Sequence, residues 1–217
     1  MENNREMTIH IDGYSFNDVL GPEGENYVTV WFHGCHRNCK GCIAGNWNDK
    51  EAVFTASSDF VSSMVADEAE LRGIHIDGFV ISGGEPFIQA EGVVSFLEGA
   101  AAELGYRPGV MVYTGYTLDE LELLSVDSPC IGSLLGMTDV LVDGEYIEEL
   151  DMNTPYAGSI NQKMHFLSDR YSVKDFPDRE RRTYISFPDE AEFMMVGIPS
   201  TEAKRIWKDI GSFMAPK

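Results

Sequence analysis

Four short apolar runs, separated by segments with helical patterns, constrain the fold of this chain more than any other feature. The runs cover residues 27–32, 78–82, 110–113 and 139–142. Their β-branched and aromatic residues are typical of buried strands. Helices are predicted between them, at residues 59–71, 90–104 and 117–124. Strands and helices that alternate in this way form parallel βαβ units, so the sequence predicts an α/β fold.

Local signals mark the ends of two of these helices. A serine at position 57 or 58 can cap the first helix, and Gly73 is expected to end it. Thr117 and Glu120, three residues apart, predict a capping box for the third. Residues 125–137 are predicted to be a loop with one helical turn.

The last fifty residues differ in character from the rest. A charged stretch at 168–182 precedes a predicted β-hairpin formed by residues 183–187 and 192–196. Ser200 is expected to cap a final helix that runs to about Phe213. We therefore expect a core domain at 1–167 and a small α+β extension, a hairpin plus a helix, at 168–217.

Each apolar run ends in small or polar residues, and these endings predict a shared site. They comprise Cys35 to Cys42, Gly83 to Glu85, Thr114 to Tyr116, and Asp143. Ligands of parallel α/β sheets bind at the carboxyl ends of the strands, so the four endings are expected to face one rim.

Three of the four cysteines, Cys35, Cys39 and Cys42, follow the first run within eight positions. Three thiolates leave one iron of a cubic iron–sulfur cluster open to a substrate, whereas a structural zinc ion needs four protein ligands. The alternative is a zinc knuckle with His33 or His36 as the fourth ligand. Cys130 stands alone and is expected to be an ordinary thiol.

Composition excludes several classes of function. The chain has 217 residues, with 16 Lys and Arg against 36 Asp and Glu, and a net charge of −20. This charge repels phosphate backbones and anionic membranes, so we expect no nucleic-acid or membrane partner. It serves either solubility or a partner with a basic docking face. The polar start, the absence of a long apolar run and the few clustered cysteines predict a cytoplasmic protein.

Taken together, these motifs resemble the radical S-adenosylmethionine (SAM) superfamily. They are the Cys-x3-Cys-x2-Cys loop, Gly-Gly-Glu-Pro, Tyr-Thr-Gly-Tyr, Val-Leu-Val-Asp-Gly and, at 158–162, Gly-Ser-Ile-Asn-Gln. Within the superfamily they most resemble the activating enzymes of anaerobic ribonucleotide reductase. The resemblance extends from about Ile11 to about Lys163 in the same order.

The resemblance implies a partial (βα)6-type barrel and a [4Fe–4S] cluster held by Cys35, Cys39 and Cys42. In this family SAM binds the fourth iron. Reduced flavodoxin or ferredoxin supplies an electron, which cleaves SAM and releases a deoxyadenosyl radical. That radical takes a hydrogen atom from a glycine of a glycyl-radical enzyme, such as anaerobic ribonucleotide reductase. The first rival function is hydrogen abstraction from a peptide or small molecule, with residues 168–217 closing over it. The second is a non-enzymatic zinc-binding interaction module.

The resemblance also implies the contacts with SAM. Gly83, Gly84 and Glu85 form the turn that meets the amino group, because glycines allow carbonyl groups to approach and a carboxylate favours the ammonium. Thr114 and Gly115 lie against SAM. Asp143 occupies the next strand end, where the activating enzymes place a polar residue.

Two departures from the family are visible. Relatives commonly carry a lysine where this chain has Glu145, so either Glu145 points away or a cation such as Arg37 or Lys40 compensates it. Many members have an aromatic residue where this chain has Gly41. Trp47 and Tyr116 are the candidates for the adenine contact.

Overall fold

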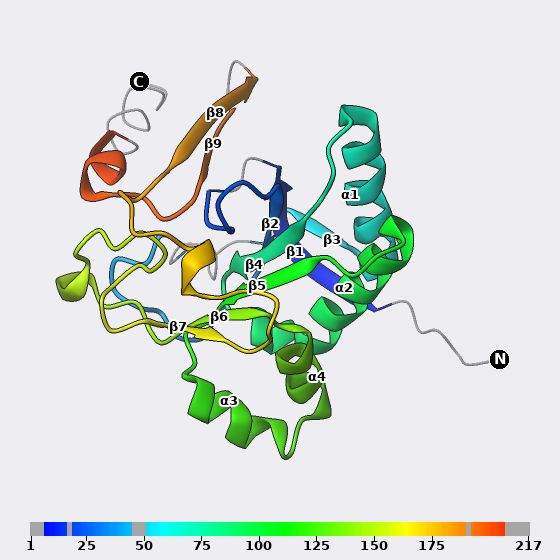
Figure 1. The fold of residues 1–217 in the computed structure, drawn as a ribbon, viewed down its shortest axis with the longest axis horizontal. Helices are drawn as coiled ribbons and strands as arrows, with labels where there is room; N and C mark the ends of the chain where they lie inside the picture. Colours follow the sequence, from blue (N-terminus) through cyan, green and yellow to red (C-terminus); the bar gives the residue numbers. More distant parts are fainter. Residues whose placement is uncertain (1–6, 17–18, 45–50, 190–191, 207–217) are drawn as a thin grey trace.

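The structure, a computed structural model, describes residues 7–16, 19–44, 51–189 and 192–206. Its centre is a seven-stranded sheet of order β3-β1-β2-β4-β5-β6-β7 (Figure 1). The strands are β1 (Thr8–Ser15), β2 (Tyr27–Phe32), β3 (Phe54–Ser57), β4 (Gly78–Gly83), β5 (Gly109–Tyr113), β6 (Val140–Asp143) and β7 (Lys163–Phe166).

The four predicted apolar runs form the parallel centre of this sheet. Strands β2, β4, β5 and β6 pair in parallel, whereas β1, β3 and β7 pair antiparallel. The predicted α/β class is therefore confirmed, with a parallel-rich sheet. The sequence did not predict β3 and β7, which are the two ends of the strand order. The partial barrel remains a prediction.

Four α-helices pack around one face of this sheet. They are α1 (Ser58–Arg72), α2 (Ala90–Leu104), α3 (Leu118–Ser125) and α4 (Pro129–Met137). Three short 3-10 segments, η2 (Pro86–Gln89), η3 (Glu148–Leu150) and η4 (Val173–Asp175), lie in the connections. The expectation of a loop at 125–137 was wrong, because α4 occupies most of it. Pro129 is at the start of α4, where a missing N–H costs nothing.

The predicted helix caps are present. The Ser57 hydroxyl accepts a hydrogen bond from the Phe60 N–H at 3.3 Å. Gly73 ends α1 in the left-handed conformation, with φ of 64°. Thr117 and Glu120 form the capping box of α3.

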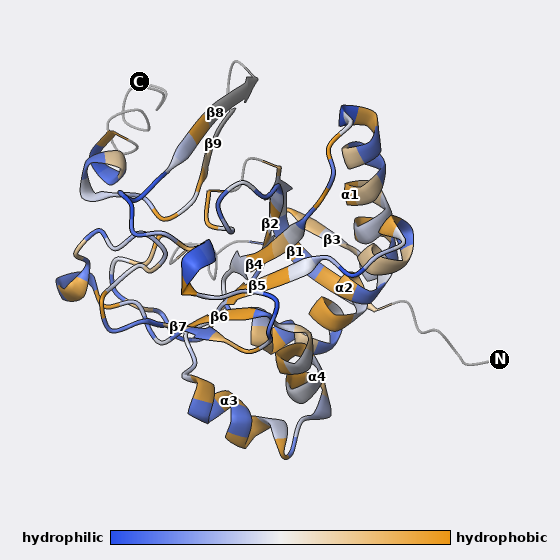
Figure 2. Cartoon of the chain, viewed as in Figure 1, coloured by the Kyte–Doolittle hydropathy of each residue, from blue (hydrophilic) through white to orange (hydrophobic). Residues whose placement is uncertain are grey.

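Side chains of the central strands alternate between two apolar clusters. On β4, Phe79 and Ile81 join the cluster under the helices, whereas Val80 joins a second cluster on the opposite face. That second cluster also contains Tyr171 and Phe176, which follow β7 in the chain. Figure 2 shows the hydrophobic residues concentrated in the central strands. The sheet is thus buried on both faces, as the near-continuous apolar runs require.

Beyond residue 176 the chain leaves the main sheet. Strands β8 (Tyr184–Asp189) and β9 (Glu192–Val196) form the predicted hairpin, whose turn at 190–191 lies outside the described residues. The Ser200 hydroxyl accepts a hydrogen bond from the Ala203 N–H at 3.1 Å and starts a helix described at 201–206. Its predicted continuation to Phe213 lies outside the described residues. No helix in the described part of the chain is long and apolar enough to cross a membrane.

The core yields a stability prediction. Phe79 is fully buried, and its ring packs edge-on against Phe96 with centroids 5.3 Å apart. Phe79→Ala should lower the free energy of unfolding by about 3–5 kcal/mol, because a cavity replaces the ring. The matched control is Leu123→Ala on α3, at a side chain that is 73% exposed; it should change stability by less than about 0.5 kcal/mol. Urea unfolding followed by circular dichroism compares the two, and equal losses would contradict this account of the core.

Candidate functional site

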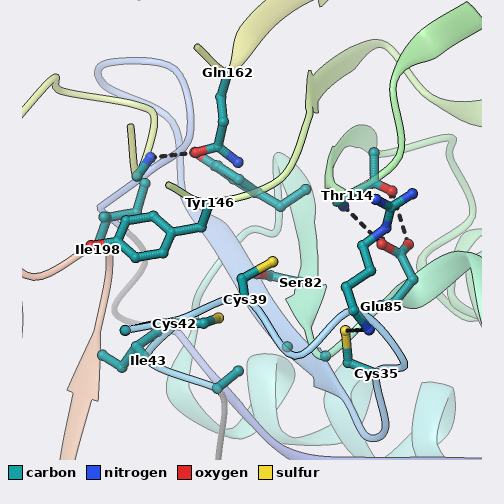
Figure 3. A pocket seen from close by; sticks show the side chains of 18 of the residues that line it. Cys35, Cys39, Cys42, Ile43, Ser82, Glu85, Thr114, Tyr146, Gln162 and Ile198 are labelled. Carbon is teal, nitrogen blue, oxygen red and sulfur yellow. Dashed lines mark hydrogen bonds between the residues drawn. The ribbon is translucent and has the colours of Figure 1, made fainter. Parts of the chain in front are cut away.

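One pocket at the carboxyl ends of the parallel strands collects the predicted site residues. All of them line it except Asp143, namely Cys35, Cys39, Cys42, Gly83, Gly84, Glu85, Thr114 and Gly115. Figure 3 shows the three cysteines in the loop after β2, with Glu85 and Thr114 on one side and Tyr146, Gln162 and Ile198 on the other. Chain segments that are distant in sequence therefore meet at one rim.

Backbone contacts fix the cysteine loop against the end of β4. Phe32 and Gly83 are register partners in the parallel pair β2–β4, so both strands end at the same level. The Gly84 N–H donates to the Phe32 carbonyl at 2.7 Å, and the Glu85 N–H donates to the Gly34 carbonyl at 2.8 Å. A Cβ atom on Gly84 would lie 2.1 Å from that carbonyl oxygen of Gly34. Only glycine permits this approach.

The three cysteines of the loop line one pocket, although no three Cys, His, Asp or Glu side chains among the described residues are grouped so that they could hold a single metal ion. None of the four cysteines, all within the described residues, forms a disulfide. Burial raises the pKa of the Cys39 thiol, an effect that the Tyr146 N–H opposes. Burial likewise raises the pKa of the Cys42 thiol. The Ala44 N–H and the positive charge of Lys204 oppose this effect and lower the pKa in part. Three thiols on one half-buried pocket wall are a suitable donor set for a cluster whose irons each take one thiolate.

The two histidines considered as zinc ligands have other partners. The Nδ1 atom of His33 lies 2.9 Å from the Asp12 carboxylate. The Nε2 atom of His36 lies 3.1 Å from the Tyr116 hydroxyl. Neither histidine lines the pocket. These contacts give no support to a zinc knuckle with either histidine as fourth ligand.

Glu85 connects the ends of β4 and β5 through hydrogen bonds. Its buried carboxylate accepts hydrogen bonds from the Phe87 N–H at 3.1 Å, the Thr114 hydroxyl at 2.9 Å and the Gly115 N–H at 2.8 Å. Burial raises the pKa of Glu85, and these three donors counter that effect by stabilising the carboxylate. The side chain thereby joins the turn after β4 to the end of β5.

Asp143, the remaining predicted residue, has a different position. It is buried, and its Oδ2 atom accepts from the N–H of Leu118, the first residue of α3, at 2.8 Å. The same oxygen lies 3.0 Å from Nε2 of His165 on β7. The next residue, Gly144, lines the pocket in its place. Asp143 thus anchors α3 beside the rim.

Glu145 is compensated by a cation. Its carboxylate lies 2.6 Å from Nη1 of Arg37, whose guanidinium stacks 4.2 Å from the centre of the Tyr116 ring. Lys40 pairs instead with Glu148 and Glu149 of η3. Of the two candidates for the adenine contact, Trp47 lies outside the described residues and Tyr116 is covered by this Arg37 stack.

Several pocket residues were not predicted. Gln162 belongs to a motif noted in the sequence; its side chain accepts from the Gly158 N–H and donates to the Gly144 carbonyl, both at 2.7 Å. It therefore shapes the pocket wall. Ile198 and Lys204 also line the pocket. They come from the last fifty residues, and no local pattern marks them.

Comparisons with known proteins agree with this arrangement. Residues 21–165 match the family described as 4Fe-4S single cluster domain. The chain is 31% identical over 151 residues to an anaerobic ribonucleoside-triphosphate reductase-activating protein of Vibrio cholerae serotype O1, covering 68% of this chain and 92% of the relative. It is 24% identical over 144 residues to the protein of the same name from Enterobacteria phage T4, covering 63% and 81%.

A structural comparison gives a partial match to QueE from Escherichia coli, with a TM-score of 0.39, 18% identity, and coverage of 51% of this chain and 54% of that one. The sequence matches carry the assignment. The chain belongs to the 4Fe–4S single-cluster domain family and to the family of anaerobic ribonucleoside-triphosphate reductase-activating proteins.

Proposed function

We propose that this protein is a radical SAM enzyme that installs a glycyl radical on an anaerobic ribonucleotide reductase or a similar partner. Two relatives bear the name of reductase-activating proteins. The observation that carries the proposal is the meeting of three cysteine thiols with the Gly83–Glu85 and Thr114–Gly115 strand ends in one pocket. The candidate cluster ligands are thereby adjacent to the strand ends that would bind SAM.

When bound, a [4Fe–4S] cluster would supply the electron for reductive cleavage of SAM, which is the chemistry needed to remove a hydrogen atom from a glycine of the partner. Cys35, Cys39 and Cys42 would each hold one iron. Gly83 and Gly84 present backbone without a side chain beside them, where the amino group of SAM can approach.

The other pocket residues would hold the strand ends in position and surround the bound ligand. Glu85 holds Thr114 and Gly115 in place, so that the end of β5 keeps a fixed distance from the end of β4. The apolar side chains of Ile43 and Ile198 line the pocket near the cysteines and would add apolar surface around a bound ligand.

The proposal extends to the surroundings of the site. The parallel strands β2, β4, β5 and β6 would be the βα units of a partial (βα)6-type barrel, and residues 168–217 would be an extension of a core at 1–167. Reduced flavodoxin or ferredoxin would deliver the electron in the cytoplasm. The acidic chain, with its net charge of −20, is suited to a partner with a basic docking face.

Anaerobic reconstitution with iron and sulfide tests the proposed function. The reconstituted protein should show the absorption of a [4Fe–4S] cluster and produce 5′-deoxyadenosine from SAM when a reductant is added. After incubation with a purified anaerobic ribonucleotide reductase, electron paramagnetic resonance should show a glycine-centred doublet. A cluster that cleaves SAM without the doublet would shift the assignment to a peptide or small-molecule substrate. No cluster and no cleavage would refute the proposal entirely.

Cysteine substitution tests the ligands. Cys39→Ala should abolish cluster assembly and SAM cleavage, because two thiolates cannot hold the cube. Cys130, on α4 with its sulfur 3.1 Å from the Ser128 hydroxyl, is the matched control. Cys130→Ala should keep nearly full iron content and activity. Loss of the cluster in Cys130→Ala would overturn the ligand assignment.

Glycine substitution tests the close approach of the cysteine loop. Gly84→Ala places a methyl group against the Gly34 carbonyl and should cost roughly 1–3 kcal/mol of stability, with loss of most of the cluster. Gly136→Ala is the control, because on α4 no atom within 4 Å would meet the added Cβ. Iron content and thermal melting compare the variants. A Gly84→Ala protein with normal iron content would show that the loop adjusts freely.

A further inference from the structure

A segment near the C-terminus forms one wall of the cluster pocket. Ile198, Pro199 and Lys204 line the pocket, and Figure 3 shows Ile198 on the side away from Glu85 and Thr114. This segment lies beyond residues 21–165, which match the family. Whatever it contributes to the site therefore does not come from the matched region.

Arg181 fixes this wall to the body of the protein. Its side chain is 1% exposed and pairs with the Asp151 carboxylate at 3.0 Å. The guanidinium also donates to the carbonyls of Thr154 at 2.9 Å, Ala157 at 2.7 Å and Pro199 at 3.0 Å. A buried guanidinium with this many acceptors holds residues 151–157 and 199 in a single arrangement.

Lys204 gives the pocket a positive charge. Its Nζ atom lies 2.8 Å from Oδ2 of Asp151 and 3.0 Å from the Tyr146 hydroxyl. Asp151 thus stands between two cations, Arg181 and Lys204, and one negative charge cannot neutralise both. Arg181 is enclosed, whereas Lys204 lines the pocket with a side chain that is 34% exposed. The excess charge therefore faces the pocket.

The ammonium of Lys204 remains able to bind a ligand. It has three N–H donors, and the described residues accept from two of them. Burial alone would lower the pKa of Lys204, but its hydrogen bonds to Asp151 and Tyr146 raise it above the usual value. The group is therefore charged at neutral pH.

The charge of Arg37, the other cation among the described pocket residues, is already compensated, although its buried Nε atom has no hydrogen-bond partner there. Its guanidinium lies 2.6 Å from Glu145 and 3.6 Å from Glu120, and it stacks on Tyr116. Two carboxylates compensate its single charge. Lys204 is thus the better partner for an anionic group that enters the pocket.

We propose that Lys204 binds the carboxylate of SAM and that Arg181 and Asp151 position it for this contact. The inference rests on the proposed function, which makes SAM the ligand of the pocket. SAM carries a sulfonium, an ammonium and one carboxylate, so the carboxylate is the group that a lysine would recognise. The C-terminal segment thereby becomes part of the SAM site.

Binding of SAM and of decarboxylated SAM tests this role. Both ligands are titrated into anaerobically reconstituted protein in the oxidised state, without reductant, so that no turnover occurs. Lys204→Gln should bind SAM about tenfold more weakly, the equivalent of one modest charge pair. It should bind decarboxylated SAM as the wild type does, and the iron content should be unchanged. Lys204→Arg, which keeps the charge, should restore most of the affinity for SAM.

Arg205→Gln is the matched control. It removes the same charge from the next residue, which is 71% exposed, pairs with Glu202 and does not line the pocket. Its affinity for SAM should match that of the wild type.

Three other results would contradict the proposed role of Lys204. An equal loss of affinity for both ligands in Lys204→Gln would overturn the inference, since Lys204 would then support the wall or the Cys42 thiolate rather than the carboxylate. Unchanged SAM binding in Lys204→Gln would overturn it as well. In both cases wild-type binding of SAM would leave the proposed function intact. A reconstituted wild type that binds no SAM would refute the proposed function and this inference together.

Discussion

The close backbone contact between the cysteine loop and the end of β4 is the constraint on which the rest of the site depends. The Glu85 N–H reaches the Gly34 carbonyl only because position 84 has no side chain. The same residue, Glu85, then binds Thr114 and Gly115 through its carboxylate. One chain of contacts thus sets the cysteines relative to two strand ends. The geometry of the site is therefore set by the ends of the parallel strands and not by the loop alone.

The sequence could predict those parts of the fold that depend on local signals. Strands buried on both faces give continuous apolar runs, and helix caps require particular residues at fixed spacings. The buried face of α1 was less predictable. Phe60 and Leu71 are 56% and 87% exposed, whereas small residues such as Ala69 pack inward. A close helix contact favours small side chains, so the largest apolar residues are a poor guide there.

The two outer strands, β3 and β7, could not be predicted from hydrophobic patterns. β3 and β7 have four residues each, at the two ends of the strand order, and most of their side chains are only partly buried. Such strands are specified by the neighbour they pair with, because a short polar segment has no strong preference of its own. β3 pairs with β1, and β7 pairs with β6, so each outer strand depends on the neighbour that the fold places beside it.

Some residues of the site can be recognised from nearby sequence, whereas others depend on contacts with distant parts of the chain. Cys35, Cys39 and Cys42 could be recognised from spacing, because one loop presents all three. Arg181 could not, since the run of charges around it resembles an exposed basic face and its burial depends on carbonyls 23 to 27 positions away.

The negative charge of the whole protein explains how the pocket can hold a lysine whose charge is not fully compensated. A lysine with an excess positive charge would be unfavourable in a basic protein. In a chain with a net charge of −20, the surrounding field stabilises it. The same negative field opposes the approach of any carboxylate. An anionic group can therefore bind in this pocket only where a nearby cation overcomes that field at short range, and Lys204 meets this requirement in the part of the pocket that the structure describes.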